Sequence, residues 1–450
     1  MAPDPDRQLP SIVEKLLAVG RPCFPVFEER RLAGVPPPEM GSAPDNLAIP
    51  DDPEDLSTIK LLPEGAAAEW LLTHVRKVED VVLARIPSWA GDGATSCLFP
   101  RQVQHSWPQT EHKPIDKCEA SCLRVTDVRG KGKGCVAARA VPRGELVARE
   151  RALLLMPRTF VTPQPAANTL ASAMTPKQRA AFFALYNCKS AEPDDALGII
   201  RTNAFLVPGM PGHNVLYSAV FETFSRINHR CGCFPLFAML KVIMSEPPIS
   251  CCPNAMFRWD KDTFSGEIRA MRPISEGEEV TIAYFQEILE PTAVTHERQK
   301  FLLAGYSFKC ACSICARSSK ARARSDDDRP IICESVNDIG AYYREMVYDW
   351  ITRGGNDHAR LLNYLHTMEA ALDREMIFYP TYWVFLARVI VMARCALREG
   401  KAARKWAQRA AQHSRALTGS DGGWDAIARE PEKCGWWGTW NKPRLRGIWD

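Results

Sequence analysis

The stretch RINHRCGCFPLFAMLKVIMSEPPISCCPNAMFRWD, residues 226–260, poses the question on which the fold depends. It begins with the run NHRC at 228–231 and ends with CPN at 252–254, directly ahead of an alternating run typical of a β-strand. Between these ends lie the apolar residues 232–244 and the loop-like SEPPIS at 245–250. The stretch is therefore either one motif divided by an insert or two unrelated pieces, and the rest of the chain has to decide between them.

Length, charge and hydropathy bound the class of protein. A chain of 450 residues has room for about two or three domains. Its net charge of +4, from 57 basic and 53 acidic residues, is too balanced to predict a direct nucleic-acid partner. The start MAPDPDRQLP is polar, and no apolar run reaches the roughly 20 residues that a membrane span needs. We therefore expect a monomeric protein without a membrane segment, located in the cytoplasm, the nucleus or both.

Residues 1–119 form an N-terminal segment in which no catalytic residues stand out. The Pro- and Asp-rich run 35–57 predicts a flexible stretch. Residues 11–19 and 65–86 predict helices, the second with apolar residues at helical spacing. We expect a segment that is partly helical and partly flexible.

From residue 120 the pattern becomes rich in short strands. β-Branched and apolar runs alternate with turns such as RGKGKG and PRGE. The expected strands are LRVTDV at 123–128, CVAARAV at 135–141, ELVARERALLLM at 145–156 and the alternating run 255–285. One helix is expected with Thr175 as N-cap and Pro176 in its first position, and another over VLYSAVFETFSRIN at 215–228.

The C-terminal third is expected to be helical. The charged run RSSKARARSDDD predicts a linker over 317–330, for which we favour a solvated tether over a nuclear-import signal. Residues 331–450 have helical periodicity and resemble a tetratricopeptide-like stack, although no clean repeat of about 34 residues is present. The strongest helical runs are 342–352, 359–376, 382–400 and 403–417. The chain as a whole is therefore expected to be α+β.

A cluster of cysteines, FKCACSIC, predicts a metal site. Three thiolates as close as Cys310, Cys312 and Cys315 can hold one tetrahedral Zn²⁺, which a fourth ligand normally closes. The candidates for that ligand are Cys231, Cys233, Cys251 and Cys252. The alternative is three incidental cysteines in a loop, but clustered cysteines in a reducing compartment more often bind metal.

Four motifs, in the same order, resemble those of a SET domain, the fold of protein-lysine methyltransferases. GKGCVAARAVPRGELV at 132–147 resembles its opening, and INHRC at 227–231 resembles the first half of its N-H-S-C-x-P-N signature. GEIRAMRPISEGEEVTIAYF at 266–285 resembles its closing strands, and ERQKFLLAGYSFKCACSIC at 297–315 resembles the zinc-binding post-SET segment. The resemblance is to the SET/MYND-like or fungal SET subfamily, without a visible MYND zinc finger.

The resemblance suggests an answer to the opening question. Removing residues 232–251 leaves RINHRCCPNAMFRWD, a nearly complete signature in which Arg230 replaces the usual Ser. We favour an insert, such as a translated intron, over a genuine extended loop, because FPLFAMLKVIM is too apolar for a comfortable surface loop. The expected domains are a SET domain at 120–290 with this insert, a post-SET zinc segment at 291–316 and a helical domain at 331–450.

The resemblance implies an enzyme that uses S-adenosyl-L-methionine to methylate a lysine amine of a protein substrate, histone or non-histone. Deprotonating a lysine of pKa about 10.4 at about pH 7 costs roughly 4.6 kcal/mol, from about 3.4 pKa units at about 1.36 kcal/mol each. An apolar aromatic channel reduces that cost and holds the amine in line with the methyl group. Two alternatives stay open: a catalytically silent SET scaffold, favoured by the insert, and a small-molecule methyltransferase.

The resemblance also assigns roles to individual residues. Tyr284 would be the catalytic tyrosine whose hydroxyl orients the amine, and Phe205 and Tyr306 would line the substrate channel. The residues expected to bind the cofactor are Lys133, Gly134, Asn203, Asn228, His229 and Phe308. The expected Zn²⁺ ligands are Cys231, Cys310, Cys312 and Cys315. This metal site would tie the signature to the post-SET segment and fix the channel between them.

Overall fold

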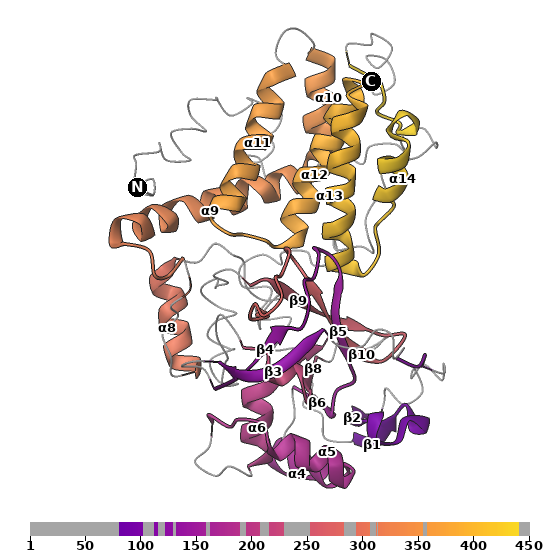
Figure 1. Cartoon of the computed structure of the whole chain (residues 1–450), viewed down its shortest axis with the longest axis vertical. Coiled ribbons are helices and arrows are strands. Elements are labelled where there is room, and N and C mark those ends of the chain that lie inside the picture. The colour runs from indigo at the N-terminus through magenta and orange to yellow at the C-terminus, as the bar shows by residue number, and fades with distance from the viewer. Residues whose placement is uncertain are drawn as a thin grey trace. The chain divides into compact units, whose positions relative to one another are not determined.

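The computed structural model describes residues 81–101, 112–115, 122–128, 132–158, 163–189, 195–207, 216–228, 253–282, 294–306, 312, 314–353 and 358–440. The chain divides into two compact units, a β-rich unit from residues 59–289 with 296–310 and a helical unit built mainly from residues 311–450 (Figure 1). Each unit has a hydrophobic core of its own. The helix predicted at 11–19 and the flexible stretch predicted at 35–57 lie outside the described residues.

The larger sheet of the β-rich unit has five strands in the order β1-β2-β6-β8-β7. β2 and β6 run parallel, and the other neighbouring strands are antiparallel. The strands are β1 (Val81–Ile86), β2 (Thr95–Pro100), β6 (Leu154–Pro157), β7 (Phe205–Val207) and β8 (Tyr217–Val220). β2 and β6 are buried along their whole length, as is usual for central strands covered on both faces.

Two smaller sheets complete the unit, one with the order β5-β10-β9 and one formed by β3 and β4. Their bounds are β3 (Leu123–Val128), β4 (Gly132–Ala137), β5 (Leu146–Glu150), β9 (Ala255–Asp260) and β10 (Ser265–Ala270). The strand expected at 123–128 is confirmed, the one expected at 135–141 lies three residues earlier as β4, and the run 255–285 contains the strands β9 and β10 in its first half. The run 145–156 divides into β5 and β6, which belong to different sheets.

A buried ion network crosses the three-stranded sheet. Glu267 of β10 is fully buried and lies opposite Arg149 of β5 and Arg258 of β9. Both arginines, together with Arg269, form ion pairs with its carboxylate. Burial alone would raise the pKa of Glu267, but the hydrogen bonds and charges of the three arginines hold that pKa at about 2. The carboxylate therefore joins all three strands through charge-assisted hydrogen bonds.

The structure differs from the sequence prediction at the N-terminal boundary. Residues 81–86, expected as the end of a helix over 65–86, form the strand β1. Through β2 this strand joins the same sheet as β6, so residues 81–100 belong to the unit that we expected to begin at residue 120. The run VVLARI suits a strand as well as a helix, and long-range pairing with residues 95–100 decides the outcome.

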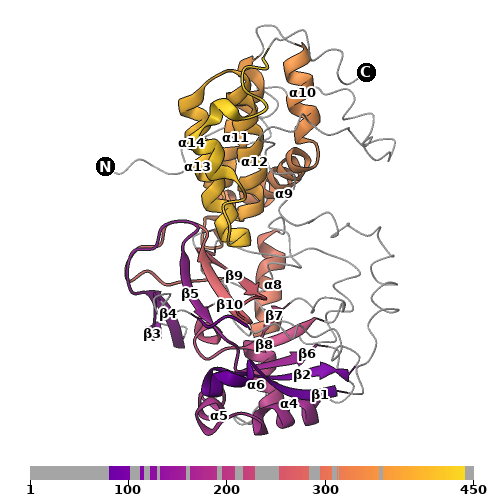
Figure 2. The same cartoon turned by 90° about the vertical axis from the view of Figure 1, so that its right-hand side faces the viewer.

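Three helices pack on the five-stranded sheet through a cluster of apolar side chains (Figure 2). They are α4 (Pro163–Ser172), α5 (Pro176–Phe183) and α6 (Ala196–Asn203). The predicted start of α5 is confirmed, because Thr175 caps it in a reciprocal capping box with Gln178. The helix predicted over 215–228 is wrong: its first half is β8, paired with β6 and β7, and its second half holds only the 3-10 turn η5 (Phe224–Arg226).

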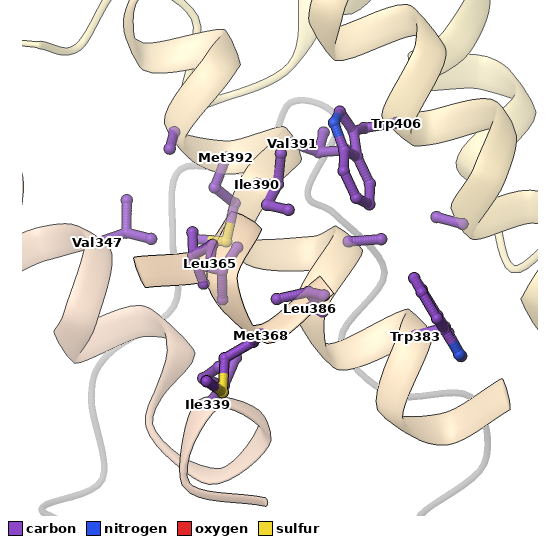
Figure 3. Close-up of a cluster of buried hydrophobic side chains, with 14 of the residues drawn as sticks. Ile339, Val347, Leu365, Met368, Trp383, Leu386, Ile390, Val391, Met392 and Trp406 are labelled. Atoms are coloured by element: carbon purple, nitrogen blue, oxygen red, sulfur yellow. The ribbon is translucent and has the colours of Figure 1, made fainter. Parts of the chain in front are cut away.

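The helical unit confirms the strongest helical predictions. Its helices are α9 (Ser319–Ala341), α10 (Tyr343–Arg353), α11 (His358–Arg374), α12 (Pro380–Ala396), α13 (Gly400–Thr418) and α14 (Trp424–Arg429). Apolar side chains from several of them form one core, which includes Trp383, Leu386 and Trp406 (Figure 3). A tetratricopeptide-like arrangement of these helices stays a prediction. No helix among the described residues is long and apolar enough to span a membrane.

The linker expected at 317–330 is instead the first half of the helix α9, which continues through Pro330. Several of its polar residues are buried. Ser325 donates its hydroxyl to the carboxylate of Glu375 after α11, and Arg329 donates to the backbone carbonyl oxygen of Glu375. Arg317, just before the helix, bonds to the same carboxylate. Arg317 and Arg329 therefore compensate the buried charge of Glu375. The sequence pattern alone does not reveal this pairing.

Candidate active site

The two ends of the opening stretch meet at one segment of the β-rich unit. Asn228 donates its Nδ2 to Oε1 of Glu279 at 3.1 Å. Asn254, only 1% exposed, donates its Nδ2 to Oε1 of Glu278 at 3.1 Å and to the carbonyl oxygen of Glu279 at 2.9 Å. The backbone N–H of Thr281 donates to Oδ1 of Asn254 at 2.8 Å. Both asparagines are thus anchored on residues 278–281, although 25 residues lie between them in the chain.

The expected insert, residues 232–251, lies outside the described residues, so its status stays a prediction. The convergence of its flanks is what a single divided motif requires. Two unrelated pieces would have no reason to share the segment 278–281 as a partner.

The glycine of the expected cofactor turn lies against the first asparagine. A Cβ atom added to Gly134 would lie 2.5 Å from Nδ2 of Asn228 and 2.6 Å from Cγ2 of Val128, which is closer than real Cβ contacts. Strand β4 also bridges from Val136 to Glu279, the partner of the Asn228 amide. Only glycine therefore allows the backbone of β4 to approach the signature this closely.

Lys133, the neighbour of Gly134, has a largely exposed side chain. Its Nζ lies 2.9 Å from the carboxylate of Asp127 across the β3–β4 hairpin. An exposed ion pair of this kind adds little stability. The placement leaves the expected role of Lys133, a backbone contact to the cofactor, compatible with the structure.

Asn203 ends helix α6, and its side chain is tied to backbone groups. Its Nδ2 donates to the carbonyl oxygens of Tyr186 at 2.7 Å and Ile199 at 2.8 Å. Its own carbonyl oxygen accepts the hydroxyl of Ser225 at 3.0 Å, which joins α6 to the turn that precedes Asn228. Asn203 is thereby connected to the signature, and its direct contact with a cofactor stays a prediction.

Phe205 lies in an aromatic cluster inside the β-rich core. Its ring centroid is 4.7 Å from that of Phe257, 5.3 Å from that of Phe221 and 6.5 Å from that of Phe224. Gly266 makes room for two of these rings, since a Cβ there would lie 2.5 Å from Phe257 and 2.9 Å from Phe221. With 5% of its surface exposed, Phe205 is primarily a core residue, and its role in a channel wall stays a prediction.

Sequence reasoning missed the residue that holds the turn before Asn228. Glu150, at the end of β5, accepts the backbone N–H of Thr223 at 2.9 Å on Oε1 and that of Phe224 at 3.0 Å on Oε2. Burial raises the pKa of Glu150 to about 7, against the opposing effect of these hydrogen bonds. The sequence signal was faint: an acidic residue ends an otherwise strand-like run.

Two of the four expected zinc ligands are described. Cys312 and Cys315 are both buried, and the backbone N–H of Cys315 donates to Sγ of Cys312 at 3.5 Å. A hydrogen bond to sulfur favours its thiolate form, which a metal requires. Among the residues that the structure describes, no group of three or more His, Cys, Asp or Glu side chains is placed to hold a metal.

The other expected site residues are not described. Tyr306 ends helix α8 (Thr295–Tyr306), and the position of its side chain is not described. The remaining expected residues outside the described ranges are His229, Cys231, Tyr284, Phe308 and Cys310. The roles that the resemblance assigns to all of these residues stay predictions.

A comparison with protein families identifies residues 132–285 as a SET domain. The match begins at β4, includes Asn228 and Asn254 and extends just past the segment 278–281. The recognition of a SET domain from its motifs is therefore confirmed. The fold is a SET domain with β-sheets, accompanied by a C-terminal helical region.

Curated relatives agree with this identification. The chain is 27% identical to histone-lysine N-methyltransferase set5 of Schizosaccharomyces pombe over 209 residues, which cover 46% of this chain and 55% of that protein. It is 32% identical to human N-lysine methyltransferase SMYD2 over 104 residues, 22% of this chain and 23% of SMYD2. It is 43% identical to histone-lysine N-methyltransferase ATXR2 of Arabidopsis thaliana over 75 residues, 16% of this chain and 15% of that protein. The matches thus span about half of set5 and less than a quarter of the other two.

Solved structures give weaker matches. A SET domain of LSMT bound to lysine and AdoHcy aligns with a TM-score of 0.23 at 11% identity, over 74% of this chain and 91% of that one. The Neurospora histone lysine methyltransferase DIM-5 aligns with a TM-score of 0.18 at 18% identity, over 37% of this chain and 54% of that one. At these scores the alignments carry no argument about the site.

Proposed function

We propose that this SET-domain protein is a protein-lysine N-methyltransferase that uses S-adenosyl-L-methionine. The observation that carries the proposal is the convergence of Asn228 and Asn254 on residues 278–281. Asn228 also lies directly against Gly134 of β4. The names of the three relatives, two histone-lysine and one N-lysine methyltransferase, support the same reaction.

The described residues fit the cofactor in two respects. Because Gly134 has no side chain, the backbone of β4 lies directly against the side chain of Asn228, so strand and signature would present their polar groups to one ligand together. The bond from Nδ2 of Asn228 to Glu279 fixes the orientation of the amide, so that its Oδ1 acceptor points away from this carboxylate. An oriented carbonyl oxygen suits the ammonium group of an amino-acid moiety such as that of S-adenosylmethionine.

The cofactor supplies an electrophilic methyl group, which passes to the lysine amine with release of one proton and S-adenosylhomocysteine. We assign to the chain the tasks of desolvating the amine, aligning it and holding it. Tyr284 would orient the amine through its hydroxyl, and the apolar walls would include Phe205 and Tyr306. Such a channel favours the neutral amine, because burial disfavours the ammonium form.

We include a structural zinc site in the proposal. Cys231 would join Cys310, Cys312 and Cys315, which would connect the signature to the post-SET segment. The buried turn of Cys312 and Cys315, with its N–H to sulfur hydrogen bond, supports this assignment. The substrate would be a protein with an accessible lysine, histone or non-histone, in the cytoplasm or the nucleus.

Two measurements test the proposal on the full chain. Calorimetry with S-adenosylmethionine separates an enzyme from a silent scaffold, because a scaffold without a cofactor site gives no binding heat. Transfer of a tritiated methyl group to cell lysate then separates protein acceptors from small molecules. Label only in the small-molecule fraction would contradict a protein-lysine methyltransferase.

A pair of variants tests the assigned roles. Tyr284→Phe should bind the cofactor nearly as well as the natural protein and lose most methyl transfer, because the hydroxyl acts on the amine. Asn228→Ala should instead weaken cofactor binding, since a polar partner is lost. Equal loss of cofactor binding in both variants would contradict the assignment of Tyr284 to the amine and of Asn228 to the cofactor.

A further inference from the structure

We propose that Glu150 is a positioning residue of the cofactor site, whose carboxylate clamps the amides of Thr223 and Phe224 and thereby sets the place of Asn228. The inference rests on the proposed function, since it concerns the affinity of that site for S-adenosylmethionine. Glu150 itself needs no contact with the cofactor.

The clamp uses both oxygens of the carboxylate. Each oxygen of Glu150 accepts one backbone N–H, from Thr223 at 2.9 Å and from Phe224 at 3.0 Å. These amides begin the 3-10 turn η5, and the fully buried Ile227 links the turn to Asn228. Because the backbone is held at both Thr223 and Phe224, a displacement of the Glu150 carboxylate reaches Asn228 over only four residues.

Other contacts hold the same turn from different elements. The Sγ of Cys135 on β4 lies 3.7 Å from the carbonyl oxygen of Thr223. The hydroxyl of Ser225 accepts the N–H of Phe221 at 3.0 Å and donates to the carbonyl oxygen of Asn203 at 3.0 Å. The turn is thus connected to β4, β5 and α6 at once. Among these contacts, the carboxylate of Glu150 is the one that carries a charge.

The surroundings of Glu150 make this charge costly. Its backbone pairs with Gly266 on β10, and its side chain lies on the same face of β5 as the buried Ala148. Burial and the negative charge of Glu222 raise its pKa. Cys135, whose Sγ contacts Thr223, has a pKa that burial raises to about 12, so its thiol stays protonated; Arg226 and Glu279 are charged groups that act on the same thiol.

The ionised carboxylate satisfies both amides best, because both of its oxygens are strong acceptors. A glutamine side chain presents an NH2 donor to one of the two amides, and a protonated carboxyl group presents a hydroxyl oxygen, a poorer acceptor than a carboxylate oxygen. One of the two hydrogen bonds is then lost or weakened, and the turn loosens. Acidification from about pH 8 to about pH 6 should therefore weaken cofactor binding, because the pKa of Glu150 is about 7.

The test compares Glu150→Gln with the natural full-length chain by calorimetry with S-adenosylmethionine. We expect about tenfold weaker binding at about pH 8, equivalent to one lost hydrogen bond. At about pH 6 the two proteins should bind S-adenosylmethionine almost equally. Glu150 is then mostly protonated, so neither side chain offers a strong acceptor to both amides. Steady-state kinetics should show a raised KM for S-adenosylmethionine with kcat nearly unchanged. Glu145→Gln is the matched control, since Glu145 pairs with Arg139 at the surface just before the same strand.

A second readout does not depend on the cofactor. Hydrogen exchange of the amides of Thr223 and Phe224 should be faster in Glu150→Gln than in the control. If the natural protein binds no S-adenosylmethionine, the proposed function fails, while faster exchange still supports the clamp. If the cofactor affinities of Glu150→Gln and the control agree within about twofold at about pH 8, the positioning role is refuted. Should Glu150→Gln not fold, Glu150→Asp takes its place, because its carboxylate is one methylene too short to reach both amides; a cofactor affinity within about twofold of the control at about pH 8 then overturns the proposal.

Discussion

Replacing Gly134 by alanine is a sharp test of the site geometry. The added Cβ would lie 2.5 Å from Nδ2 of Asn228 and 2.6 Å from Cγ2 of Val128, so at least one of these groups has to move. The end of an amide side chain yields more readily than a strand that is paired along its length. We therefore expect Asn228 to turn away and to lose its hydrogen bond to Glu279.

The magnitude follows from these contacts. Overpacking costs about 1–3 kcal/mol, and the lost hydrogen bond about 1 kcal/mol. If about 1.5–3 kcal/mol of this total falls on the cofactor site, the affinity for S-adenosylmethionine should drop about 10- to 150-fold. The midpoint of thermal unfolding without cofactor should fall by roughly 4–16 °C, from about 2–4 kcal/mol at about 2–4 °C per kcal/mol for a unit of this size.

Calorimetry with S-adenosylmethionine measures the effect, and two other glycines provide controls. Gly93→Ala places a Cβ at an ordinary 3.7 Å from its nearest neighbour and should be neutral. Gly132→Ala, in the same strand as Gly134, meets nothing within 4 Å but has a φ of +72°, so it reports backbone strain alone. Unchanged affinity in Gly134→Ala, or an equal loss in Gly132→Ala, would refute the reasoning.

Three further outcomes are expected. Metal analysis should find about one Zn²⁺ per chain, lost in Cys231→Ser and kept in Cys252→Ser; the reverse pattern would name a different fourth ligand. Deleting residues 232–251 should give a more soluble protein that binds S-adenosylmethionine more tightly and gains methyl transfer, whereas unfolding would mark the segment as part of the structure. Glu267→Gln should lower the free energy of unfolding in urea by about 3–5 kcal/mol at neutral pH, because it removes the carboxylate that pairs with Arg258 and Arg269 and leaves Arg149 only its longer ion pair with Asp260. Since the pKa of Glu267 is depressed to about 2, its contribution should be lost as pH falls from about 4.5 towards about 2, and the variant should lack that loss.

The SET strands could be predicted because their signals are local. Alternating β-branched runs broken by Gly-rich turns gave the bounds of β3, the existence of β4 with a shift of three residues, and the region of β9 and β10, and the capping residue Thr175 gave the start of α5. The N-terminal strand β1 and the strand β8 were mistaken for helices. Their short apolar runs fit both periods, and only pairing with distant strands decides between them.

In the candidate site, too, residues with a local sequence motif were predicted and a residue that acts through distant contacts was missed. Gly134, Asn203 and Asn228 were recognised from motifs, and the described structure links Asn228 directly to Gly134 and, through Ser225 and the turn, to Asn203. Glu150 was missed, because its function depends on two backbone amides more than 70 residues away in the chain. A side chain that recognises backbone groups leaves no complementary residue type in the sequence, so no motif reports it.

The shared anchor at residues 278–281 has a consequence for synthesis of the protein. Asn228 and Asn254 leave the ribosome well before their partners Glu278, Glu279 and Thr281, so neither can be held in its final place until then. Chains grow at about 5–20 residues per second, so a nascent chain exposes the unfinished site for seconds. During that interval the aromatic residues around Phe205 have no completed core to enter, and chaperone binding or aggregation competes with folding. Translation rate across the last strands of the β-rich unit should thus govern how much of the newly made protein reaches a state that binds cofactor.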